Sequence, residues 1–409
     1  MKDKILNVVK NNTMLIVLVL VVLFFQISTG GFLEGKMLQP SQFNALVTQN
    51  AYVYVLATGM LMCMLTGGNI DLSCGSFVCF VGVIGAQIMV AMMNGGVSPV
   101  LATVVGILVM IVVGAIYGSL LGFIIAYVNI PPWIATLAGF LALRGLGVAL
   151  ISNSKYGNGS SISNLPAEFC QLFSGKLNDF FGGPRINGIQ YNMTSIVIAL
   201  IACVIFILLT LRERKMRIKK GYEVQSKAAT ITKLVLVCFV IMLFGYKYSL
   251  AGGVPYALIW VGAIVLIYNF ITSKTDVGRY FYTIGGNSEA TRLSGIDTKR
   301  IMFIAYLNMA VLTVFSAFFT MARYTAANTT AGTNYEMDAI SACVVGGVSA
   351  YGGSGTVFGM IVGATLIGVI NIGMFLMNID ANWQKVVKGA VLLGAVVFEI
   401  LNNKKKGTK

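Results

Sequence analysis

The chain has 409 residues, of which 57% are hydrophobic and only 11% are charged, and its mean hydropathy is +0.84. A soluble domain carries about 25% charged residues, so this composition excludes an ordinary soluble protein and indicates a chain that lies in a lipid bilayer. The net charge is +15, but the basic residues gather between apolar runs without an aromatic-basic platform, so we expect no nucleic-acid partner.

Apolar runs of helix length recur along the whole chain. Many exceed the ~18 residues that mark a spanning helix, and they lack the alternation of barrel strands. The predicted fold class is all-α: a polytopic membrane helical bundle of about 10–12 transmembrane helices with Gly-rich short or re-entrant segments, in a single domain over residues 1–409. The expected segments are 13–32, 45–66, 73–93, 98–127, 132–151, 192–211, 231–249, 254–272, 300–321, 336–351, 355–377 and 384–402.

Basic residues orient these segments through the positive-inside rule. Lys2, Lys4 and Lys10 place the N-terminus in the cytoplasm, and no clear cleavage site follows the first run, which is predicted to be a retained span. Alternation then places the loop 152–191 outside, either as a lid or as a tolerated insertion. The basic segment 212–233 falls in the cytoplasm, as a topology determinant that touches anionic lipid or as a partner contact.

The segment 336–351 is short and Gly-rich, and it has two interpretations. It is either a full crossing or a half-helix, because irregular backbone is tolerated where it is buried in protein or lines a cavity. The basic tail around Lys404, Lys406 and Lys409 lies in the cytoplasm only if the crossings are even in number. The charge bias therefore favours a full crossing and a cytoplasmic C-terminus.

Asp71 lies in the short link before the third segment. A carboxylate near an apolar boundary is costly unless it is hydrated or caps a helix. Asp71 or Ser73 can cap that helix, with the carboxylate against its positive end. The alternative is a direct role in a transport pathway.

A second break follows Asn129, where two prolines stop one helix and start another. The helix start beyond them leaves free N–H groups that a polar ligand could use. Asn129, Trp133 and Thr136 are therefore candidate pathway or helix-start residues, and Trp133 is also a candidate interface anchor. Arg144, further along, is expected to snorkel outward.

Glycine marks two further features of the sequence. The segments 67–75 and 346–355 are each Gly-interrupted and each precedes an apolar run, a weak internal echo of the kind that points to a transporter pathway. Gly355, Gly359 and Gly363 form two small-xxx-small steps, which predict close packing of helix backbones.

No motif of catalytic chemistry is present in the sequence. Histidine is absent, which removes the usual metal ligand and proton shuttle. There is no phosphate-binding loop pattern, and no acidic relay runs through the apolar segments. We therefore expect no enzyme and no catalytic, cofactor or metal site. Seven cysteines without a CxxC pair are interpreted as small buried hydrophobes.

The loop 273–300 holds the most informative stretch, residues 285–295, Gly-Gly-Asn-Ser-Glu-Ala-Thr-Arg-Leu-Ser-Gly. Gly285 and Gly286 allow a turn without a Cβ penalty. Asn287 can cap a short helix, and Gly295 can end it. Bulky substitutions at Gly286 or Gly295 are expected to misplace this helix.

The short helix has the features of a docking element. Glu289 and Arg292 are three residues apart and lie on one side of it. Ala290 and Leu293 would supply an apolar anchor for a groove in a soluble partner, and the two charges would set the register.

Two of these segments resemble the bacterial sugar-permease family of ABC importers. Residues 68–76, Gly-Asn-Ile-Asp-Leu-Ser-Cys-Gly-Ser, are similar to the family's Gly-Ile-Asp-Leu-Ser-Val-Gly-Ser signature, with Asn69 inserted and Cys74 in place of Val. Residues 131–137, Pro-Pro-Trp-Ile-Ala-Thr-Leu, followed by Arg-Gly at 144–145, resemble its Pro-Pro-Phe-Ile-x-Thr-Leu and Arg-Gly segment.

Two more matches lie in the second half of the chain. The strongest is at 278–296, which resembles the cytoplasmic coupling loop of the family, with Thr291 where Ala is common. Residues 346–371 match its last Gly-rich block. The chain's length, the basic segment 212–223 and an extra helix pair look like the xylose or multiple-monosaccharide permease subfamily.

The resemblance implies a permease subunit in the bacterial cytoplasmic membrane. It implies a homodimer or pseudo-dimer that works with ABC ATPase subunits, which bind ATP, and with an external sugar-binding protein. The substrate would be a monosaccharide such as xylose or galactose. An ion-coupled secondary transporter of a small polar solute is the alternative. That class needs carboxylates or an ion site at broken helices, which the spans almost entirely lack.

Overall fold

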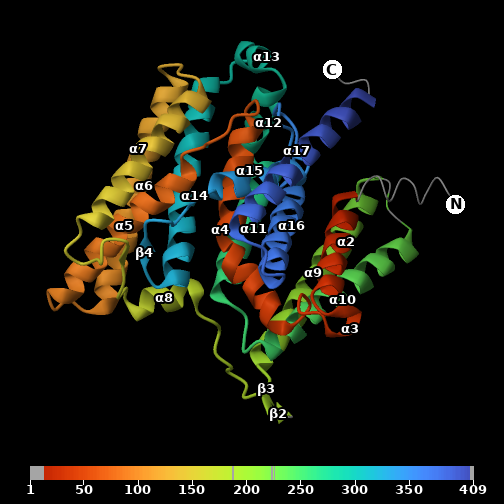
Figure 1. Cartoon of the computed structure of the whole chain (residues 1–409). Helices are drawn as coiled ribbons and strands as arrows, with labels where there is room; N and C mark the ends of the chain where they lie inside the picture. Colours follow the sequence, from red (N-terminus) through yellow and green to blue (C-terminus); the bar gives the residue numbers. More distant parts are fainter. Residues whose placement is uncertain (1–12, 187, 223, 225, 406–409) are drawn as a thin grey trace. The chain divides into compact units, whose positions relative to one another are not determined.

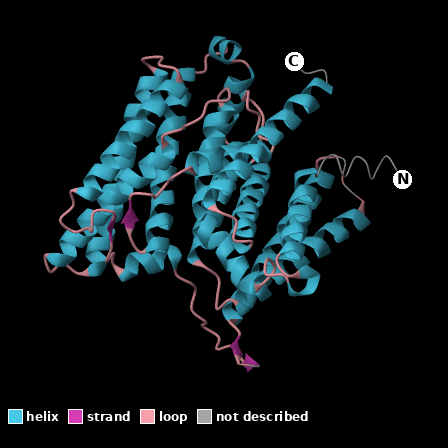
Figure 2. Ribbon diagram, viewed as in Figure 1, coloured by secondary structure: helices cyan, strands magenta, loops and turns pink. Residues whose placement is uncertain are grey.

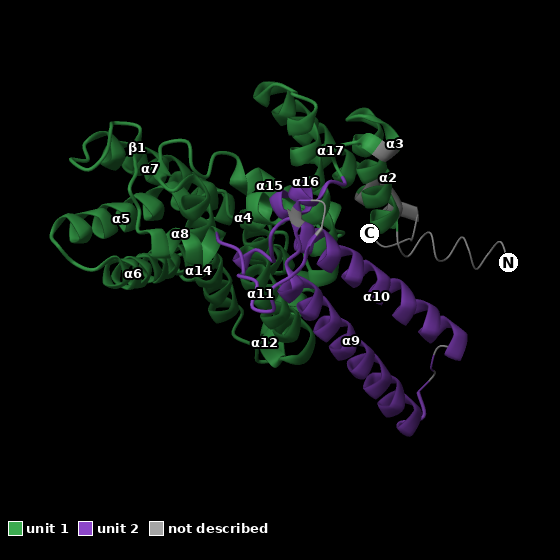
Figure 3. Ribbon diagram, turned by 90° about the horizontal axis from the view of Figure 1, so that it is seen from below, with its two compact units in different colours: residues 1–37, 46–174, 257–409 green, residues 38–45, 175–256 purple. Residues whose placement is uncertain are grey.

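The computed structural model describes residues 13–186, 188–222, 224 and 226–405 (Figure 1). Helices dominate this part of the chain, and the strands are short two-residue pieces (Figure 2). The chain divides into two compact units, which Figure 3 colours separately. Unit 1 comprises Met1–Met37, Leu46–Ser174 and Ala257–Lys409, and unit 2 comprises Leu38–Ala45 and Gly175–Tyr256.

The elements follow one another as a run of helices with a few strand pairs between them. Strands β1 and β4 pair antiparallel, and so do β2 and β3. In chain order the elements are α2 Thr13–Ser28, α3 Gly31–Glu34, α4 Pro40–Leu65, α5 Cys74–Asn94, α6 Pro99–Ala126, α7 Pro132–Ser152, β1 Ser161–Ile162, α8 Ala167–Ser174, β2 Arg185–Ile186, β3 Ile189–Gln190, α9 Met193–Lys219, α10 Lys227–Leu250, α11 Tyr256–Lys274, α12 Asp276–Gly286, α13 Ser288–Leu293, α14 Thr298–Tyr324, β4 Ala327–Asn328, α15 Tyr335–Val345, α16 Val357–Leu376 and α17 Ala381–Lys405.

Each of the twelve predicted apolar segments overlaps one of these helices, so the prediction of a polytopic helical bundle is confirmed. Within the described residues, nine helices are long and apolar enough to cross a membrane: α4, α5, α6, α7, α9, α10, α11, α14 and α16. Helix α2 is apolar but has only 16 residues.

Helix α15 corrects the expectation of a full crossing at 336–351. It has 11 residues, which is about 16 Å at 1.5 Å per residue, whereas the hydrocarbon core is about 30 Å thick. The Gly-rich residues after Val345 are turns and bends. The half-helix interpretation is therefore the right one, and the charge argument for a single spanning helix fails here.

Unit 1 is built around a few enclosed helices. Helix α4 is the most enclosed of the spans, with 83% of its apolar window buried, whereas α7 has 22% of its window buried. Helix α14 packs against α5 and α6, α7 packs against α5, and α16 packs against α2 and α15. The outer helices expose large apolar side chains, as helices do when their other neighbour is lipid.

Glycines let the helices of unit 1 approach closely. A Cβ at Gly363 of α16 would overlap the Ala342 carbonyl oxygen of α15, and one at Gly359 would overlap the carbonyl oxygen of Gly346, the residue that ends α15. The close packing predicted from their spacing is thus confirmed. A second series, Gly114, Gly118 and Gly122 on α6, packs in the same way against α14, and sequence inspection missed it.

The long loop 152–191 is folded. In unit 1, β1 pairs with β4, and α8 buries Phe169 and Phe173 against α14. The ring of Phe173 stacks on that of Phe318, with 4.9 Å between the ring centroids. This half of the loop is therefore anchored to the bundle.

Unit 2 is mainly a hairpin of two long helices, α9 and α10. Asn192 caps α9, its side chain accepting from the Ser195 N–H at 3.0 Å, and Ser226 caps α10. The two helices approach at Gly245, which faces Ala199. Both expose rows of large apolar side chains, Leu200, Val204 and Leu208 on α9 and Val235, Phe239 and Val240 on α10 among them.

The carboxylate of Asp179 organises the loop before α9. It accepts hydrogen bonds from the Gly183 N–H at 2.6 Å and from the N–H and hydroxyl of Thr194 at 3.2 and 3.0 Å. Partial burial raises the pKa of Asp179, but these hydrogen bonds outweigh it and bring the pKa to about 2. The loop is therefore held by an ionised carboxylate.

We predict that this loop loosens in acid. Because the folded pKa is below the ~3.9 of an unfolded aspartate, the stabilisation is complete above about pH 4 and is lost as the pH falls toward about 2. Hydrogen exchange of the Gly183 and Thr194 amides, corrected for intrinsic rates, should show protection falling across that range. Asp179→Asn should show weak protection at every pH. A native loop whose protection does not change with pH would contradict this assignment.

Candidate functional site

The predicted docking segment forms two short helices in unit 1, α12 and α13. Thr275 caps α12, its hydroxyl accepting from the Gly278 N–H at 3.1 Å. Asn287 separates the helices: its N–H donates to the Thr283 carbonyl at 3.0 Å and its side-chain oxygen accepts from the Ala290 N–H at 2.9 Å. The predicted cap at Asn287 is confirmed. Gly295, with φ +87°, follows α13 in a conformation that disfavours other residues.

Helix α13 is exposed on one side and fixed on the other. Leu293 is 74% exposed, and Ala290 is exposed beside it. Thr291 is buried, and its hydroxyl donates to the Asn287 carbonyl at 2.8 Å. The exposed face therefore carries an apolar side chain on a helix whose opposite side is held in place.

Glu289 and Arg292 form the predicted pair on this helix. The guanidinium donates to both carboxylate oxygens, at 2.6 and 3.1 Å. The hydrogen bond and the charge of Arg292 lower the pKa of Glu289, so the pair is fully charged at neutral pH. Exposed pairs of this kind are screened by solvent and contribute little to stability, so the pair mainly orders two side chains on the surface.

The two glycines before α13 have roles that differ from the prediction. Both belong to the last turn of α12 and do not form a free turn. A Cβ at Gly285 would overlap the Leu65 carbonyl oxygen and the Gly353 nitrogen, whereas a Cβ at Gly286 would meet nothing within 4 Å. A Cβ therefore fits at Gly286 and does not fit at Gly285, which makes Gly285 the more constrained position; the effect of a bulkier side chain at Gly286 stays a prediction.

Three main-chain segments meet at Gly285, and we call this contact the glycine junction: residues 65–68 at the end of α4, residues 350–353 between α15 and α16, and residues 285–286 at the end of α12. The Gly353 N–H donates to the Leu65 carbonyl at 3.1 Å. Gly353 has φ +71°, and a Cβ on it would lie 2.8 Å from the Gly286 nitrogen. Tyr282 ties α12 to the same loop through its hydroxyl, which donates to the Gly355 carbonyl at 3.0 Å.

The glycine junction also brings together the two Gly-interrupted segments of the sequence. A Cβ at Gly68 would overlap the Ala350 carbonyl, and one at Gly352 would overlap the main chain of Gly67. The weak sequence echo thus corresponds to a direct contact between its two copies. The end of helix α12 contacts both Gly-interrupted segments, and α13 is connected to them through α12.

Asp71 lies just beyond the junction, 1% exposed. Its carboxylate accepts from the N–H and the hydroxyl of Ser73 at 2.8 and 2.6 Å, and the Tyr117 hydroxyl donates to Ser73 Oγ at 2.7 Å. Ser73 precedes α5 but makes no side-chain cap bond to it. Asp71 therefore fixes the turn before α5, and neither residue caps the helix in the predicted way.

The other candidate residues make no hydrogen bond to Asp71 among the described residues. Asn129 is exposed, with φ +63°, and Trp133 is exposed in the first turn of α7. Thr136 is buried, and its hydroxyl donates to the Pro132 carbonyl of its own helix at 2.9 Å. Helix α7 reaches the Asp71 turn through another residue, Gly139, which faces Ser73 and the Tyr117 hydroxyl.

Arg144 points inward, against the prediction that it snorkels outward. Its guanidinium donates to the main-chain carbonyls of Ala331 at 2.8 Å and of Thr329 at 3.4 Å. These carbonyls lie in the irregular link between α14 and α15, where helix bonds are lacking. An arginine has five donors and can satisfy several such acceptors at once.

Sequence inspection missed two buried acids in the first turns of α15. Glu336 is 4% exposed, lies against Gly75 at the start of α5, and its Oε2 has no hydrogen-bond partner among the described residues. Asp338 is 2% exposed; it accepts from the Tyr52 hydroxyl at 2.6 Å and pairs with Lys388 at 2.8 Å. The sequence did hold a signal for them, because two acidic residues stand two positions apart at the start of the Gly-rich segment.

The Asp338–Lys388 pair links three helices of unit 1: α15, α17 and α4, the last through Tyr52. The ring of Tyr52 also stacks on that of Tyr335, with 3.6 Å between the ring centroids. Removing one partner of a buried ion pair costs about 3–5 kcal/mol, because the other charge is left unpaired. The pair therefore fixes the register of the last helix against the half-helix α15.

Comparison with known proteins gives consistent matches over the chain. A family model described as the permease component of branched-chain amino acid transport systems matches residues 180–396. The chain is 31% identical over 392 residues to the xylose transport system permease protein XylH of Haemophilus influenzae, covering 96% of each chain.

Two further relatives are similar at comparable coverage. The galactose/methyl galactoside import permease MglC of Salmonella typhimurium is 28% identical, over 92% of this chain and 91% of that protein. The ribose import permease RbsC of Escherichia coli is 29% identical, over 89% and 86% respectively. No solved structure matches the chain.

We predict different outcomes for alanine at the two adjacent glycines. Gly285→Ala forces a Cβ into main-chain atoms, and overpacking of this kind costs about 1–3 kcal/mol. Gly286→Ala places its Cβ in open space and serves as the matched control. Thermal unfolding of the purified chain in detergent should show a lower midpoint for the first variant and a midpoint near that of the native chain for the second. Equal midpoints for the two variants would refute the close approach at Gly285.

Proposed function

The chain belongs to the family of transport-system permeases that includes the xylose, galactose and ribose permeases, and on this premise we propose that it is the membrane subunit that imports a monosaccharide with energy from a separate ATPase. It is a multi-pass membrane protein. The proposed partners are ABC ATPase subunits that bind ATP, an external sugar-binding protein, and a second copy of the chain. The relatives' names support a pentose or hexose as the substrate.

The exposed face of α13 is the observation that carries this proposal. Leu293 is 74% exposed on a short helix whose opposite side is fixed, and an ordered ion pair flanks it. Interfaces concentrate their binding energy in a few such anchors surrounded by polar residues. Leu293 would enter a groove of the ATPase, and Glu289 and Arg292 would set the orientation.

The glycine junction supplies a short mechanical route from α13 into the bundle. A movement of α13 displaces the end of α12, where Gly285 is in main-chain contact with residues 65 and 353. Main-chain contacts have no side chain that can adjust, so the displacement is passed on to both Gly-interrupted segments. One leads to the Asp71 turn and α5, and the other to α16. Opening of the pathway to alternate sides is the type of transition such rigid coupling supports.

The buried polar groups fit this function better as supports than as an ion relay. The Asp71 carboxylate is engaged by Ser73, and Asp338 is neutralised by Lys388. The relatives named above are sugar permeases, which supports the importer over an ion-coupled transporter. The residues predicted to lie at a helix start or in the pathway, Asn129, Trp133 and Thr136, remain candidates for these roles.

We predict that changing the α13 face uncouples transport. Leu293→Ser should lower sugar uptake at least tenfold in proteoliposomes that also hold the ATPase subunit, since anchor residues contribute about 2 kcal/mol or more. Glu289→Lys should act in the same direction by placing like charges at the docking face. Phe181→Ser, which removes an exposed aromatic ring from the loop before α9, is the control and should keep full uptake.

Two measurements decide this prediction. Unfolding midpoints of the variants should equal that of the native chain, because both α13 side chains are exposed. In the variants, co-purification of the ATPase should decrease in parallel with the uptake of labelled xylose, ribose or galactose. Full uptake and full ATPase association in Leu293→Ser would leave α13 as a plain linker and remove the main support for this function.

The proposed orientation places the N-terminus and the segments 212–233 and 273–300 in the cytoplasm and the loop 152–191 outside the cytoplasmic membrane, on the charge bias. The cytoplasmic C-terminus depended on a full crossing at 336–351, which α15 is too short to make, so it is not part of this proposal. Lys155→Cys and Lys219→Cys test it, because both side chains are exposed. An impermeant maleimide added to intact cells should label the first and not the second. The native chain is the blank, since five of its seven cysteines are buried and two are half-buried. The reverse labelling would invert the topology.

A further inference from the structure

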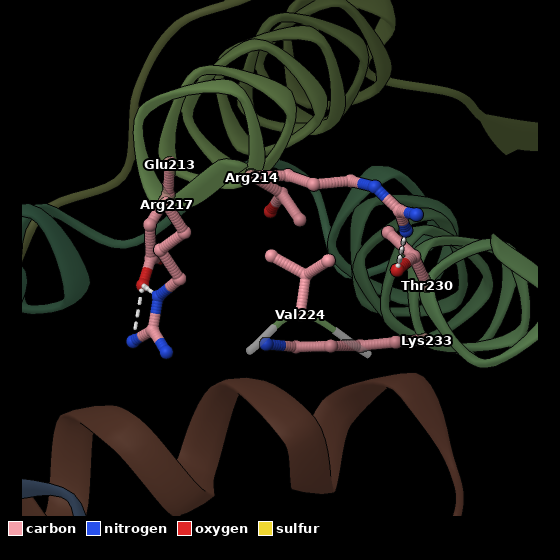
Figure 4. Close-up of a pocket in the computed structure, with 7 residues that line it drawn as sticks. Glu213, Arg214, Arg217, Val224, Thr230 and Lys233 are labelled. Atoms are coloured by element: carbon pink, nitrogen blue, oxygen red, sulfur yellow. Dashed lines mark hydrogen bonds and ion pairs between the residues drawn. The ribbon is translucent and has the colours of Figure 1, made fainter. Parts of the chain in front are cut away.

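Unit 2 holds a cavity of about 170 Å³ between the C-terminal end of α9 and the N-terminal end of α10 (Figure 4). Its lining is basic and polar, with one acid, and consists of Thr210, Glu213, Arg214, Arg217, Val224, Thr230 and Lys233. The volume is large enough for several water molecules. A small polar group with its own oxygens therefore fits inside.

The charges around the cavity do not balance. Arg217 is paired with Glu213 at 2.9 Å, so these two cancel. Arg214 donates to the Thr230 hydroxyl and, at 3.5 Å, to the Ser226 carbonyl, both of which are neutral. The Lys233 ammonium has no hydrogen-bond or ion-pair partner within the part of the chain that the structure describes. Among the described residues that line the cavity, the positive charges of Arg214 and Lys233 are thus left without an anion.

Helix α10 adds to this attraction. Its first turn is capped by Ser226, whose hydroxyl accepts from the Ala229 N–H at 3.2 Å. Thr230 and Lys233 lie in the next turns and line the cavity. The N-terminal end of a helix carries partial positive charge and favours anions. An arginine fork and an ammonium next to a helix start are donors that bind phosphate oxygens, whereas the Thr230 hydroxyl already donates to the Ser226 carbonyl at 3.1 Å.

The cavity lies at the depth where lipid headgroups are found. The part of α9 from Met193 to Leu211 is about 28 Å long at 1.5 Å per residue, which matches the ~30 Å hydrocarbon core. Arg212 and the basic residues after it therefore begin where the hydrocarbon ends. Large apolar side chains, Leu208 and Leu209 on α9 and Val235 and Leu236 on α10, are exposed on the hairpin next to the cavity, on its hydrocarbon side.

We propose that this cavity binds one phosphate group, taken from an anionic phospholipid headgroup or from soluble phosphate. The depth of the cavity and the apolar side chains below it favour the lipid, whose acyl chains would lie along the hairpin. The site belongs to unit 2 alone and does not depend on the transport function proposed above. It gives the basic segment 212–233 a specific ligand in addition to its role in topology.

The test counts lipids bound to the purified full chain by native mass spectrometry. Phosphatidylglycerol is compared with phosphatidylcholine of the same acyl chains, since both carry the phosphate but only the first is anionic. Arg214→Gln with Lys233→Gln removes the two unbalanced charges. Lys219→Gln with Lys220→Gln is the matched control, because it removes two charges from the same segment outside the cavity.

The expected result is a preference for phosphatidylglycerol in the native chain that falls about five- to tenfold in the cavity variant and stays near the native value in the control. Equal loss in both variants would mean diffuse attraction to the basic segment and would overturn the proposal. No loss in either would overturn it as well. Lys233→Gln alone, which breaks no contact, decides the matter if the double variant does not fold.

A second arm separates the two sources of phosphate. Inorganic phosphate at millimolar concentration is added to the native chain with bound phosphatidylglycerol. Retention of the lipid supports the headgroup as the ligand, and displacement of the lipid by phosphate supports soluble phosphate at the same site. Displacement that is equally strong with sulfate and with chloride of equal ionic strength would show screening only and would overturn the site.

Discussion

Main chains touch in this protein at positions where no side chain would fit, and the bundle depends on that close approach. In lipid there is little hydrophobic force between helices, so their association relies on packing and hydrogen bonds. Glycines on α6 let that helix pack closely on the small side chains and main chain of α14, and glycines on α16 face main-chain carbonyls of α15 and its C-terminal end. At the glycine junction the same device joins three irregular segments, where Leu65 also accepts a main-chain hydrogen bond from Gly353. Contacts of this kind are stiff, because no rotamer can change to relieve them.

Irregular backbone inside a bundle needs partners for its polar groups, and this chain supplies them with charged side chains. Asp71 engages the turn before α5, and Arg144 donates to carbonyls of the link before α15. Asp338 and Lys388 then tie α15 to the last helix. Charged side chains within the bundle therefore reach the places where helices are interrupted. They allow the half-helix α15 and the link before α5 to exist, and these are the segments on which α12 leans.

The features that we propose face the cytoplasm divide into a mechanical part and an anchoring part. Helix α13 adds almost nothing to stability through its exposed ion pair, but it presents Leu293 on a fixed base. The α9–α10 hairpin carries most of the basic segment and a cavity with unbalanced charge. Helix α13 suits contact with the ATPase, which is proposed to move during transport, and the cavity suits a phosphate group that remains bound.

The sequence by itself determined what depends on neighbours along the chain. The apolar runs located the helices, Asn287 was recognisable as a cap, and the spacing of Gly359 and Gly363 indicated close packing. Tertiary structure alone decided which of two adjacent glycines is constrained, which way Arg144 points, and that Glu336 and Asp338 are buried. Tyr52 and Asp338, for example, are 286 residues apart. Hydropathy and capping act within one or two turns, whereas such contacts depend on the rotation of each helix about its axis, which an all-round apolar helix does not encode in its pattern.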